Sequence, residues 1–357
     1  MNWLLPLTPL VIYLHWSHSV SETWIFVIAC IAILPLAGWL GHATEHLAAK
    51  TNESIGGLLN ATFGNAAELI IAISALRAGL YDVVKASLTG SIVGNLLLVL
   101  GASILAGGLK YPEQKFSAKA ARSQSTLLTL AAISLVLPAA FHYLARGARD
   151  SASLERDLSL EFAVLLLIIY GLSLFFTLKT HKDYFTGELE AESHGPGWSM
   201  GKSLGILGAA TAAIAVVSEI LVASVEHAAH AFGMSSIFVG VIVVAIVGNA
   251  AEHSTAILVA RKNRMDLSLS IAIGSSLQIA IFVAPLLVVL SHFIGPRPMD
   301  LVFTIAEVLA VAVSVFITGQ VADDGVSHWM EGVQLLGVYI MLGILFYFLP
   351  VAAAAAH

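Results

Sequence analysis

The sequence contains a single cysteine, Cys30, which excludes an intrachain disulfide and any cysteine-based zinc or iron–sulfur site. Charged residues are also scarce: Asp, Glu, Lys and Arg make up 11% of the 357 residues, against about 25% in an ordinary soluble domain. The formal net charge of −6 offers no basic surface for nucleic acid, so no nucleic-acid partner is expected. Hydrophobic residues instead make up 58% of the chain, and the mean hydropathy is +0.89. This composition is typical of a polytopic membrane protein.

The hydrophobic residues gather in runs about as long as a membrane-spanning helix, which needs about 20 residues. The runs are continuous rather than alternating, which excludes a β-barrel. They lie at 22–49, 55–79, 85–109, 120–145, 158–180, 200–230, 236–261, 266–291, 299–321 and 332–350. A shorter run at 2–16 makes one more span if its helix tilts or the bilayer thins. The predicted fold class is therefore an all-α polytopic membrane protein with about 11 transmembrane helices.

The basic residues orient these helices. With eleven crossings, most of the 17 Lys and Arg residues fall on one side of the membrane, and the positive-inside rule makes that side cytoplasmic. We therefore expect a cytoplasmic N-terminus and a C-terminus outside. We separately expect residence in a prokaryotic cell (inner) membrane, embedded in its lipid bilayer.

A five-residue motif occurs twice. Gly64-Asn65-Ala66-Ala67-Glu68 recurs 184 residues later as Gly248-Asn249-Ala250-Ala251-Glu252, and the same offset aligns Gly90-Ser91 with Gly274-Ser275. Each half is then a five-helix unit, and an odd number of helices makes the second copy cross the membrane in the opposite sense. Such inverted repeats are typical of secondary transporters, whose sites lie near the midplane at the repeat interface. The predicted parts are an N-terminal transmembrane helix at 1–21, a first repeat at 22–180 (motif 64–68), an acidic connector at 181–199, an inverted second repeat at 200–350 (motif 248–252) and a tail at 351–357.

Glu68 and Glu252 lie near the middle of apolar spans, where a carboxylate is costly unless it is protonated, paired or bound to a cation. A pair of packing motifs with protonated glutamates is the alternative interpretation. The candidate metal ligands, all oxygen donors, are Glu68, Glu252, Asn65 and Asn249, supported by Gly64, Gly248, Ser91, Asn95, Ser275 and Gln278. Hard cations such as Ca²⁺ take six to eight oxygen ligands, and two carboxylates neutralise the charge of this ion.

The two motifs, the Gly90-Ser91-x-x-x-Asn95 and Gly274-Ser275-x-x-Gln278 segments, and the acidic connector together resemble the calcium/proton exchanger (CAX) family of the cation/Ca²⁺ exchanger superfamily. The similarity covers about residues 22–350. It implies a secondary antiporter rather than an enzyme, with Ca²⁺ as transported substrate, protons as the exchanged ion and no organic cofactor. Sodium/calcium exchangers usually carry a Ser/Thr-rich, Pro-containing motif instead of Asn-Ala-Ala-Glu, so its absence favours coupling to protons.

The resemblance also assigns supporting roles. It implies that Glu45 and Glu226, each followed by a histidine (His46 and His227), serve in proton transfer or gating. It further suggests that the acidic connector, which contains Glu188, Glu190 and Glu192, senses or concentrates Ca²⁺; an acidic solvated linker explains the same charges.

Other functions remain open at this point. The same scaffold could exchange Na⁺, Mn²⁺ or K⁺, or exchange Na⁺ for Ca²⁺, and a cation channel also lines its pore with carboxylates. The segment His42-Ala43-Thr44-Glu45-His46 matches an inverted zinc-peptidase pattern, so an intramembrane zinc hydrolase is a further alternative. The second repeat has Ala223 where His42 falls, so the histidine pair is not duplicated. The sequence leaves the oligomeric state open, a homo-oligomer included.

Overall fold

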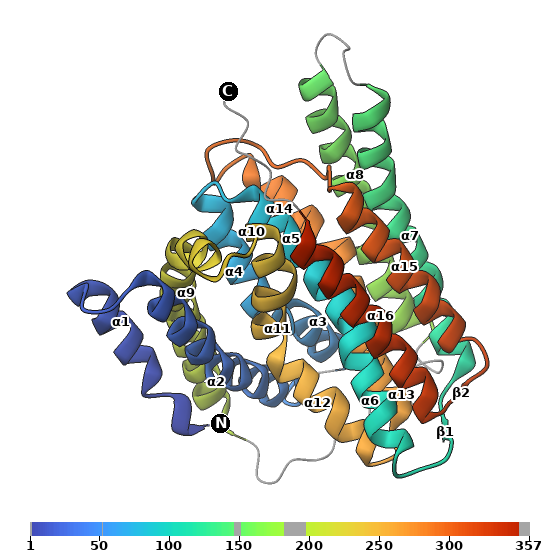
Figure 1. Ribbon diagram of the computed structural model, residues 1–357. Helices are drawn as coiled ribbons and strands as arrows, with labels where there is room; N and C mark the ends of the chain where they lie inside the picture. The colour runs from blue at the N-terminus through green and yellow to red at the C-terminus, as the bar shows by residue number, and fades with distance from the viewer. Residues whose placement is uncertain (1, 52, 146–150, 182–197, 350–357) are drawn as a thin grey trace.

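The computed structural model describes residues 2–51, 53–145, 151–181 and 198–349, and these are mostly helical, which confirms the predicted all-α membrane fold (Figure 1). The first half contains η1 (Asn2–Leu4), α1 (Leu7–Ser17), α2 (Glu22–Ala48), α3 (Glu53–Phe63), α4 (Ala66–Arg77), α5 (Tyr81–Val93), η2 (Gly94–Val99), α6 (Leu100–Gly108), β1 (Gln114–Lys115), α7 (Ala118–Leu144), α8 (Ser151–Phe175) and η3 (Phe176–Thr180). The second half contains α9 (Met200–Phe232), α10 (Ser236–Phe238), η5 (Val239–Val244), α11 (Ala245–Gly248), α12 (Ala250–Arg261), α13 (Met265–Gln278), η6 (Ile279–Val283), α14 (Ala284–Ser291), α15 (Ile305–Val321), β2 (Val326–Ser327) and α16 (Trp329–Phe348).

Seven of the described helices are long and apolar enough to cross a membrane, and the bent pair formed by residues 236–248 and 250–261 makes an eighth. Helices α1 and α15 are shorter, with 11 and 17 residues. The total of about 11 transmembrane helices therefore stays a prediction.

The two motif-bearing spans are not continuous helices, contrary to the runs predicted at 55–79 and 236–261. Gly64 and Asn65 separate α3 from α4, and Asn249 separates α11 from α12, where the helix axis bends by 62°. The Asn residue lies directly before the first residue of the following helix in both places. Helix breaks at membrane depth are tolerated where the freed backbone groups line a protein-enclosed or water-filled site.

Four further helical segments contain π-turns, which are enriched at functional sites. Segments η2 and η6 follow α5 and α13 at equivalent places in the two halves. Segment η5 lies in the second half, whereas the equivalent residues of the first half belong to the regular helix α3. The fourth, η3, ends the span of α8.

The starts of several helices follow from local hydrogen bonding. The hydroxyls of Ser117 and Ser199 accept hydrogen bonds from backbone amides in the first turns of α7 and α9. Thr304 and Glu307 form a reciprocal capping box that begins α15. The short strands β1 and β2 pair antiparallel and join the loop before α7 to the loop before α16.

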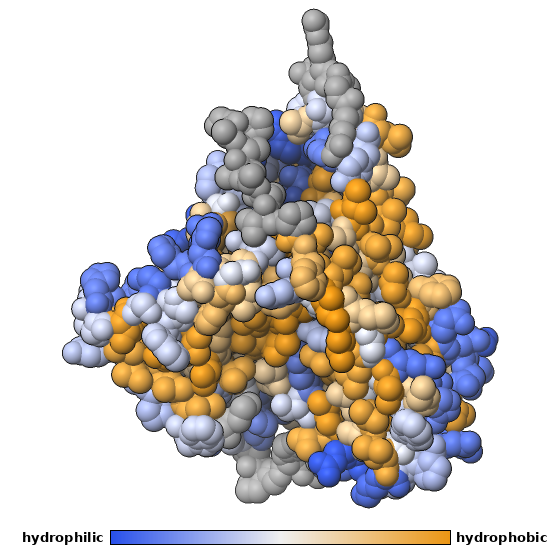
Figure 2. Space-filling model, in the orientation of Figure 1, coloured by the Kyte–Doolittle hydropathy of each residue, from blue (hydrophilic) through white to orange (hydrophobic). Residues whose placement is uncertain are grey.

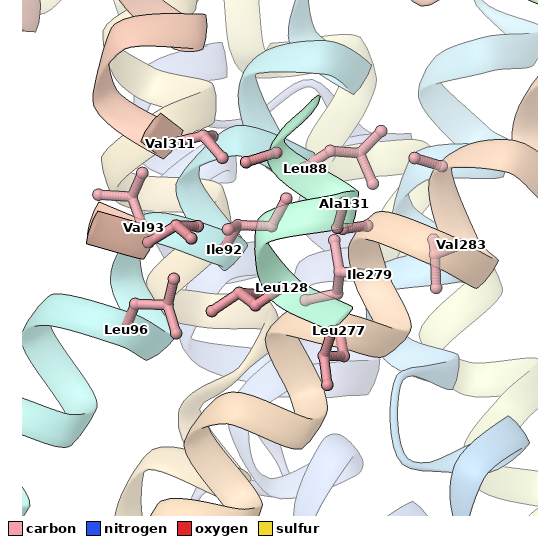
Figure 3. Packing of buried hydrophobic residues seen from close by; sticks show 14 of the residues in the cluster. Leu88, Ile92, Val93, Leu96, Leu128, Ala131, Leu277, Ile279, Val283 and Val311 are labelled. Carbon is pink, nitrogen blue, oxygen red and sulfur yellow. The ribbon is translucent and has the colours of Figure 1, made fainter. Parts of the chain in front are cut away.

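The buried hydrophobic side chains form two clusters. One is centred on α2 and α9, which pack against each other along their length with α1 outside them (Figure 1). The other joins the remaining spans; at its centre, Ile92 and Leu96 of the α5–η2 segment meet Leu128 of α7 and Ile279 of η6 (Figure 3). The α2–α9 cluster also includes Ala66 and Ile71 of α4 and Val247 of α11, so the two clusters meet at the motif-bearing spans.

Hydrophobic side chains dominate the face shown in Figure 2, and hydrophilic side chains gather mainly at its margins. Exposed aromatic residues lie near helix ends, including Trp3, Trp16 and Trp24. Aromatic side chains at such positions are typical of the membrane–water interface.

Candidate ion-binding site

The two repeated motifs face each other at the helix breaks. A methyl group placed on Gly64 would lie 3.4 Å from Oε1 of Glu252, and one placed on Gly248 would lie 3.3 Å from Oε1 of Glu68. Each carboxylate therefore lies against the glycine of the opposite repeat. A methyl group at Gly248 would crowd the Glu68 carboxylate, whereas one at Gly64 would make ordinary contact with Glu252 and would clash with the backbone oxygen of Asn60, 2.7 Å away.

The carboxylates are incompletely satisfied by the protein. The Oε2 atoms of Glu68 and Glu252 are buried, and neither has a hydrogen-bond partner among the described residues. A buried anionic oxygen without a partner is costly, so these atoms need protons or a cation.

The predicted amide and hydroxyl ligands form one network across the repeats. The amide of Asn65 donates to Oε1 of Gln278, and the Ser275 hydroxyl donates to Oδ1 of Asn65 at 3.1 Å. In the other pairing, the amide of Asn249 donates to the Ser91 hydroxyl at 2.9 Å. Both asparagines thus contact the serine of the opposite half, as the inverted repeat requires.

Asn95 joins the two pairings. Its amide nitrogen lies 3.0 Å from Ser275 Oγ and 3.4 Å from Asn249 Oδ1, and its Oδ1 lies 3.2 Å from Nε2 of His253. The 184-residue offset aligns Asn95 with Ile279, so this part of the network has no counterpart in the other half. The contact with His253 was not predicted; its position directly after Glu252 was the available signal.

A small cavity of about 10 Å³ lies beside Glu68, bounded also by Ser87, Ser91 and Gly248. It has room for about one water-sized particle. Ser87 was absent from the predicted ligand set, although it lies one turn before Ser91 on α5 and therefore shares its face.

The residues predicted for proton transfer lie apart from this network. Glu45 is exposed, and its carboxylate lies 3.5 Å from His42 one turn earlier on α2. The His46 ring packs against Trp198, with ring centroids 4.6 Å apart. Glu226 and His227 are exposed near the end of α9. The packing of His46 on Trp198 weakens the zinc-peptidase interpretation of this segment. The connector glutamates predicted to sense Ca²⁺, Glu188, Glu190 and Glu192, lie outside the described residues.

Comparison with known proteins identifies the family. The model of the sodium/calcium exchanger protein family matches residues 21–179 and 202–348. The chain belongs to this family. The two matched segments correspond to the two halves that carry the repeated motif.

Individual relatives are similar over nearly the whole chain. The chain is 46% identical to a Ca²⁺/H⁺ antiporter of Aphanothece halophytica, covering 98% of this chain and 96% of the relative. It is 44% identical to the Ca²⁺/H⁺ antiporter ChaA of Bacillus subtilis, covering 96% of each. Among solved structures, native YfkE matches with a TM-score of 0.82 at 42% identity, covering 96% of this chain and 97% of that one. The H⁺/Ca²⁺ exchanger CAX shares the fold at 14% identity, with a TM-score of 0.72, covering 97% of this chain and 91% of that one.

Proposed function

We propose that this protein is a secondary Ca²⁺/H⁺ antiporter that exports Ca²⁺ from the cytosol in exchange for protons. The observation that carries the proposal is the pair of facing glutamates, each with a buried and unpartnered oxygen, in a network of oxygen donors. The relatives named as Ca²⁺/H⁺ antiporters, similar over the whole chain, support the same conclusion.

The donor set suits a hard divalent cation. Carboxylate, amide and hydroxyl oxygens are the ligands that Ca²⁺ prefers, and its flexible coordination tolerates a site assembled from two repeats. We assign the carboxylates of Glu68 and Glu252 as the principal ligands, with Asn65 and Asn249 completing the set. Transition metals would favour imidazole or thiolate ligands, which do not dominate this network.

Coupling follows from competition for the two carboxylates. Ca²⁺ binding requires both carboxylates to be ionised. Protonation neutralises the carboxylates and removes the negative charge that holds the ion. Either occupancy satisfies the buried oxygens, and an empty charged site would be costly at membrane depth. The site therefore favours crossing in a loaded form, with protons or with Ca²⁺, which is what obligatory exchange requires.

The two halves differ in a way that suits alternating access. Gly90 of α5 is buried against η5, where a methyl group on it would lie 2.0 Å from the carbonyl oxygen of Val241. Its equivalent, Gly274 of α13, is partly exposed and has nothing within 4 Å of the same position. We infer that η5 closes the site on one side, that α3 leaves it accessible on the other, and that transport exchanges these two arrangements.

The α2–α9 pair provides a second moving part. These helices form the centre of one hydrophobic cluster, and they contact the motif-bearing spans, which add Ala66 and Ile71 of α4 and Val247 of α11 to it. We infer that the pair rocks against the bundle while the site stays nearly fixed. In the proposed orientation, with a cytoplasmic N-terminus and a C-terminus outside, the open α3 side faces the cytosol. The domain boundaries at 22–180 and 200–350 are part of the same proposal.

Transport into vesicles tests the function directly. Purified protein is reconstituted, a pH gradient is imposed, and uptake of Ca²⁺, Mn²⁺ and Na⁺ is measured in turn. We expect Ca²⁺ uptake coupled to proton release, abolished by Glu68→Gln and by Glu252→Gln but not by Glu219→Gln on α9. Transport of Na⁺ alone would refute the substrate, and full Ca²⁺ transport by either site variant would refute the site.

A further inference from the structure

One end of the bundle carries basic side chains beside exposed apolar ones. The loop after α6 and the loop after α12 lie together there, although about 150 residues separate them in the sequence. Hydrophilic residues gather at the lower margin of the face in Figure 2, below the ends of α6 and α12 in Figure 1. Lys110, after α6, and Arg261, the last residue of α12, are exposed cations at this end, and Lys115 and Lys262 are exposed close to them in the sequence.

Hydrogen bonds, one of them buried, hold the two loops together. Gln114, which is 1% exposed, donates to the carbonyl of Ala260 at 2.8 Å and to Asn263 Oδ1 at 3.1 Å. The ammonium of Lys110 lies 3.5 Å from the carbonyl of Arg261. The two loop backbones that carry the cations are therefore held side by side by the fold.

Within the described part of the chain, the two cations lack anionic partners. Among the described residues, neither Lys110 nor Arg261 has a carboxylate within ion-pair distance. Nearby carboxylates are engaged elsewhere: Asp266 accepts from the backbone of Ser117, and Asp323 pairs with Arg122. Glu113 is an exposed carboxylate on the same loop.

Exposed apolar side chains also lie at this end. Leu109, directly before Lys110, is 74% exposed, and Trp329 at the start of α16 is 48% exposed. Trp329 packs beside Gly108, since a methyl group there would lie 2.6 Å from its backbone nitrogen. This combination of exposed apolar and basic side chains is complementary to an anionic phospholipid. The acyl chains of the lipid would contact the tryptophan and the leucine, and its phosphate would contact the cations.

We propose that Lys110 and Arg261, with Leu109 and Trp329, form a binding site for the phosphate headgroup of an anionic phospholipid. The proposal is independent of which ion the protein carries, so it stands or falls separately from the antiport function. Each cation near the surface strengthens binding of an anionic lipid by about fivefold, so the pair contributes about 25-fold. Removing Glu113 should strengthen binding further, because it takes away a like charge from the lipid phosphate.

The test measures lipid binding by the full-length protein in a neutral detergent. Phosphatidylglycerol and phosphatidylcholine with the same short chains are titrated, and the unfolding midpoint and the bound lipid (by native mass spectrometry) are recorded. We expect phosphatidylglycerol to bind more tightly, Lys110→Gln/Arg261→Gln to lose about 25-fold in its affinity, and Glu113→Gln to gain. Arg156→Gln, an exposed charge at the opposite end of the molecule, is the matched control and should change nothing.

Three outcomes would overturn the proposal. The first is equal binding of the two lipids by the unmodified protein, and the second is an unchanged phosphatidylglycerol affinity in the double variant. The third is full stabilisation by glycerol 3-phosphate or inorganic phosphate, because the ligand would then be a soluble phosphate rather than a lipid. If the double variant fails to fold, the single variants and Glu113→Gln decide the matter, since the latter should increase binding.

Discussion

Replacing Gly274 with alanine should destabilise one of the two access states and leave the other unaffected. In the observed arrangement the added methyl group has nothing within 4 Å, so folding and Ca²⁺ binding should be preserved. If transport exchanges the open and closed conformations of the two halves, α3 packs against α13 in the other state in the way that η5 packs against α5 in the observed one. The methyl group at residue 274 would then meet the backbone of α3 as closely as one at Gly90 meets Val241, at 2.0 Å.

The size of the effect follows from that overlap. Carbon and oxygen atoms that are not bonded rarely approach within about 3 Å, so the helices would have to separate by about 1 Å. Overpacking of this kind costs about 3 kcal/mol, which lowers the population of the closed α3 state by about a hundredfold. Because every cycle must pass through that state, the turnover rate should fall by a similar factor.

The assay compares turnover with binding. Initial rates of Ca²⁺ uptake are measured in vesicles, and Ca²⁺ affinity is measured on the same protein in detergent. For Gly274→Ala we expect about a hundredfold slower uptake with an affinity within about twofold of the unmodified protein. Gly319→Ala on α15 adds the same methyl group where nothing lies within 4 Å, and should leave both quantities unchanged.

A companion variant acts on the opposite state. Gly90→Ala places its methyl group against Val241 in the observed arrangement, so it should destabilise that arrangement and lower the unfolding midpoint. The exchange of closed and open halves would be refuted if Gly274→Ala transported within threefold of the unmodified rate. It would equally be refuted if Gly274→Ala lowered the unfolding midpoint as much as Gly90→Ala.

Other expectations concern the site and the core. Raising the pH should tighten Ca²⁺ binding, because protons and Ca²⁺ compete for two carboxylates. The largest expected gain in Ca²⁺ affinity is about a hundredfold per pH unit, and an affinity independent of pH would contradict the competition. Asn249→Ala removes the hydrogen bond to Ser91 and should weaken Ca²⁺ binding by about tenfold in a titration, whereas Ser254→Ala on the exposed face of α12 should not. Leu97→Ala empties a fully buried position and should cost about 2–5 kcal/mol of stability, seen as a lower unfolding midpoint; Leu172→Ala, at an exposed position, should cost little.

Most helix positions could be predicted because a membrane span is set by the length of an apolar run. The runs predicted at 120–145 and 266–291 are close to the observed segments 118–144 and 265–291. The run predicted at 299–321 begins too early, since α15 starts at Ile305 after the Thr304 cap. Apart from Asp300, residues 299–303 are apolar, so hydropathy alone could not locate that helix start.

The helix breaks were harder to predict. The motif 64–68 reads as part of an apolar helix, and asparagine and glycine only weakly disfavour helix interiors. What breaks the helix is the opposite repeat: each Asn side chain bonds to a serine 150 or more residues away, and each Gly meets the other repeat's carboxylate. These interactions are tertiary, and only the internal offset between the repeats hinted that the partners would be exchanged.

The structural difference between the two halves could not be predicted from the repeated sequence. Gly56 and Gly240 occupy equivalent places in the two motif spans, and Gly90 and Gly274 occupy equivalent places on the helices they face. A duplicated sequence predicts two equivalent glycine contacts, yet in the structure Gly90 is packed against η5 while Gly274 is open. Two closed contacts would bury the site on both sides, and two open contacts would let ions leak across the membrane. One closed and one open contact is therefore the arrangement that exchange requires, and the near-equivalence of the two halves keeps the free-energy difference between the two arrangements small enough for Ca²⁺ and protons to drive the protein between them.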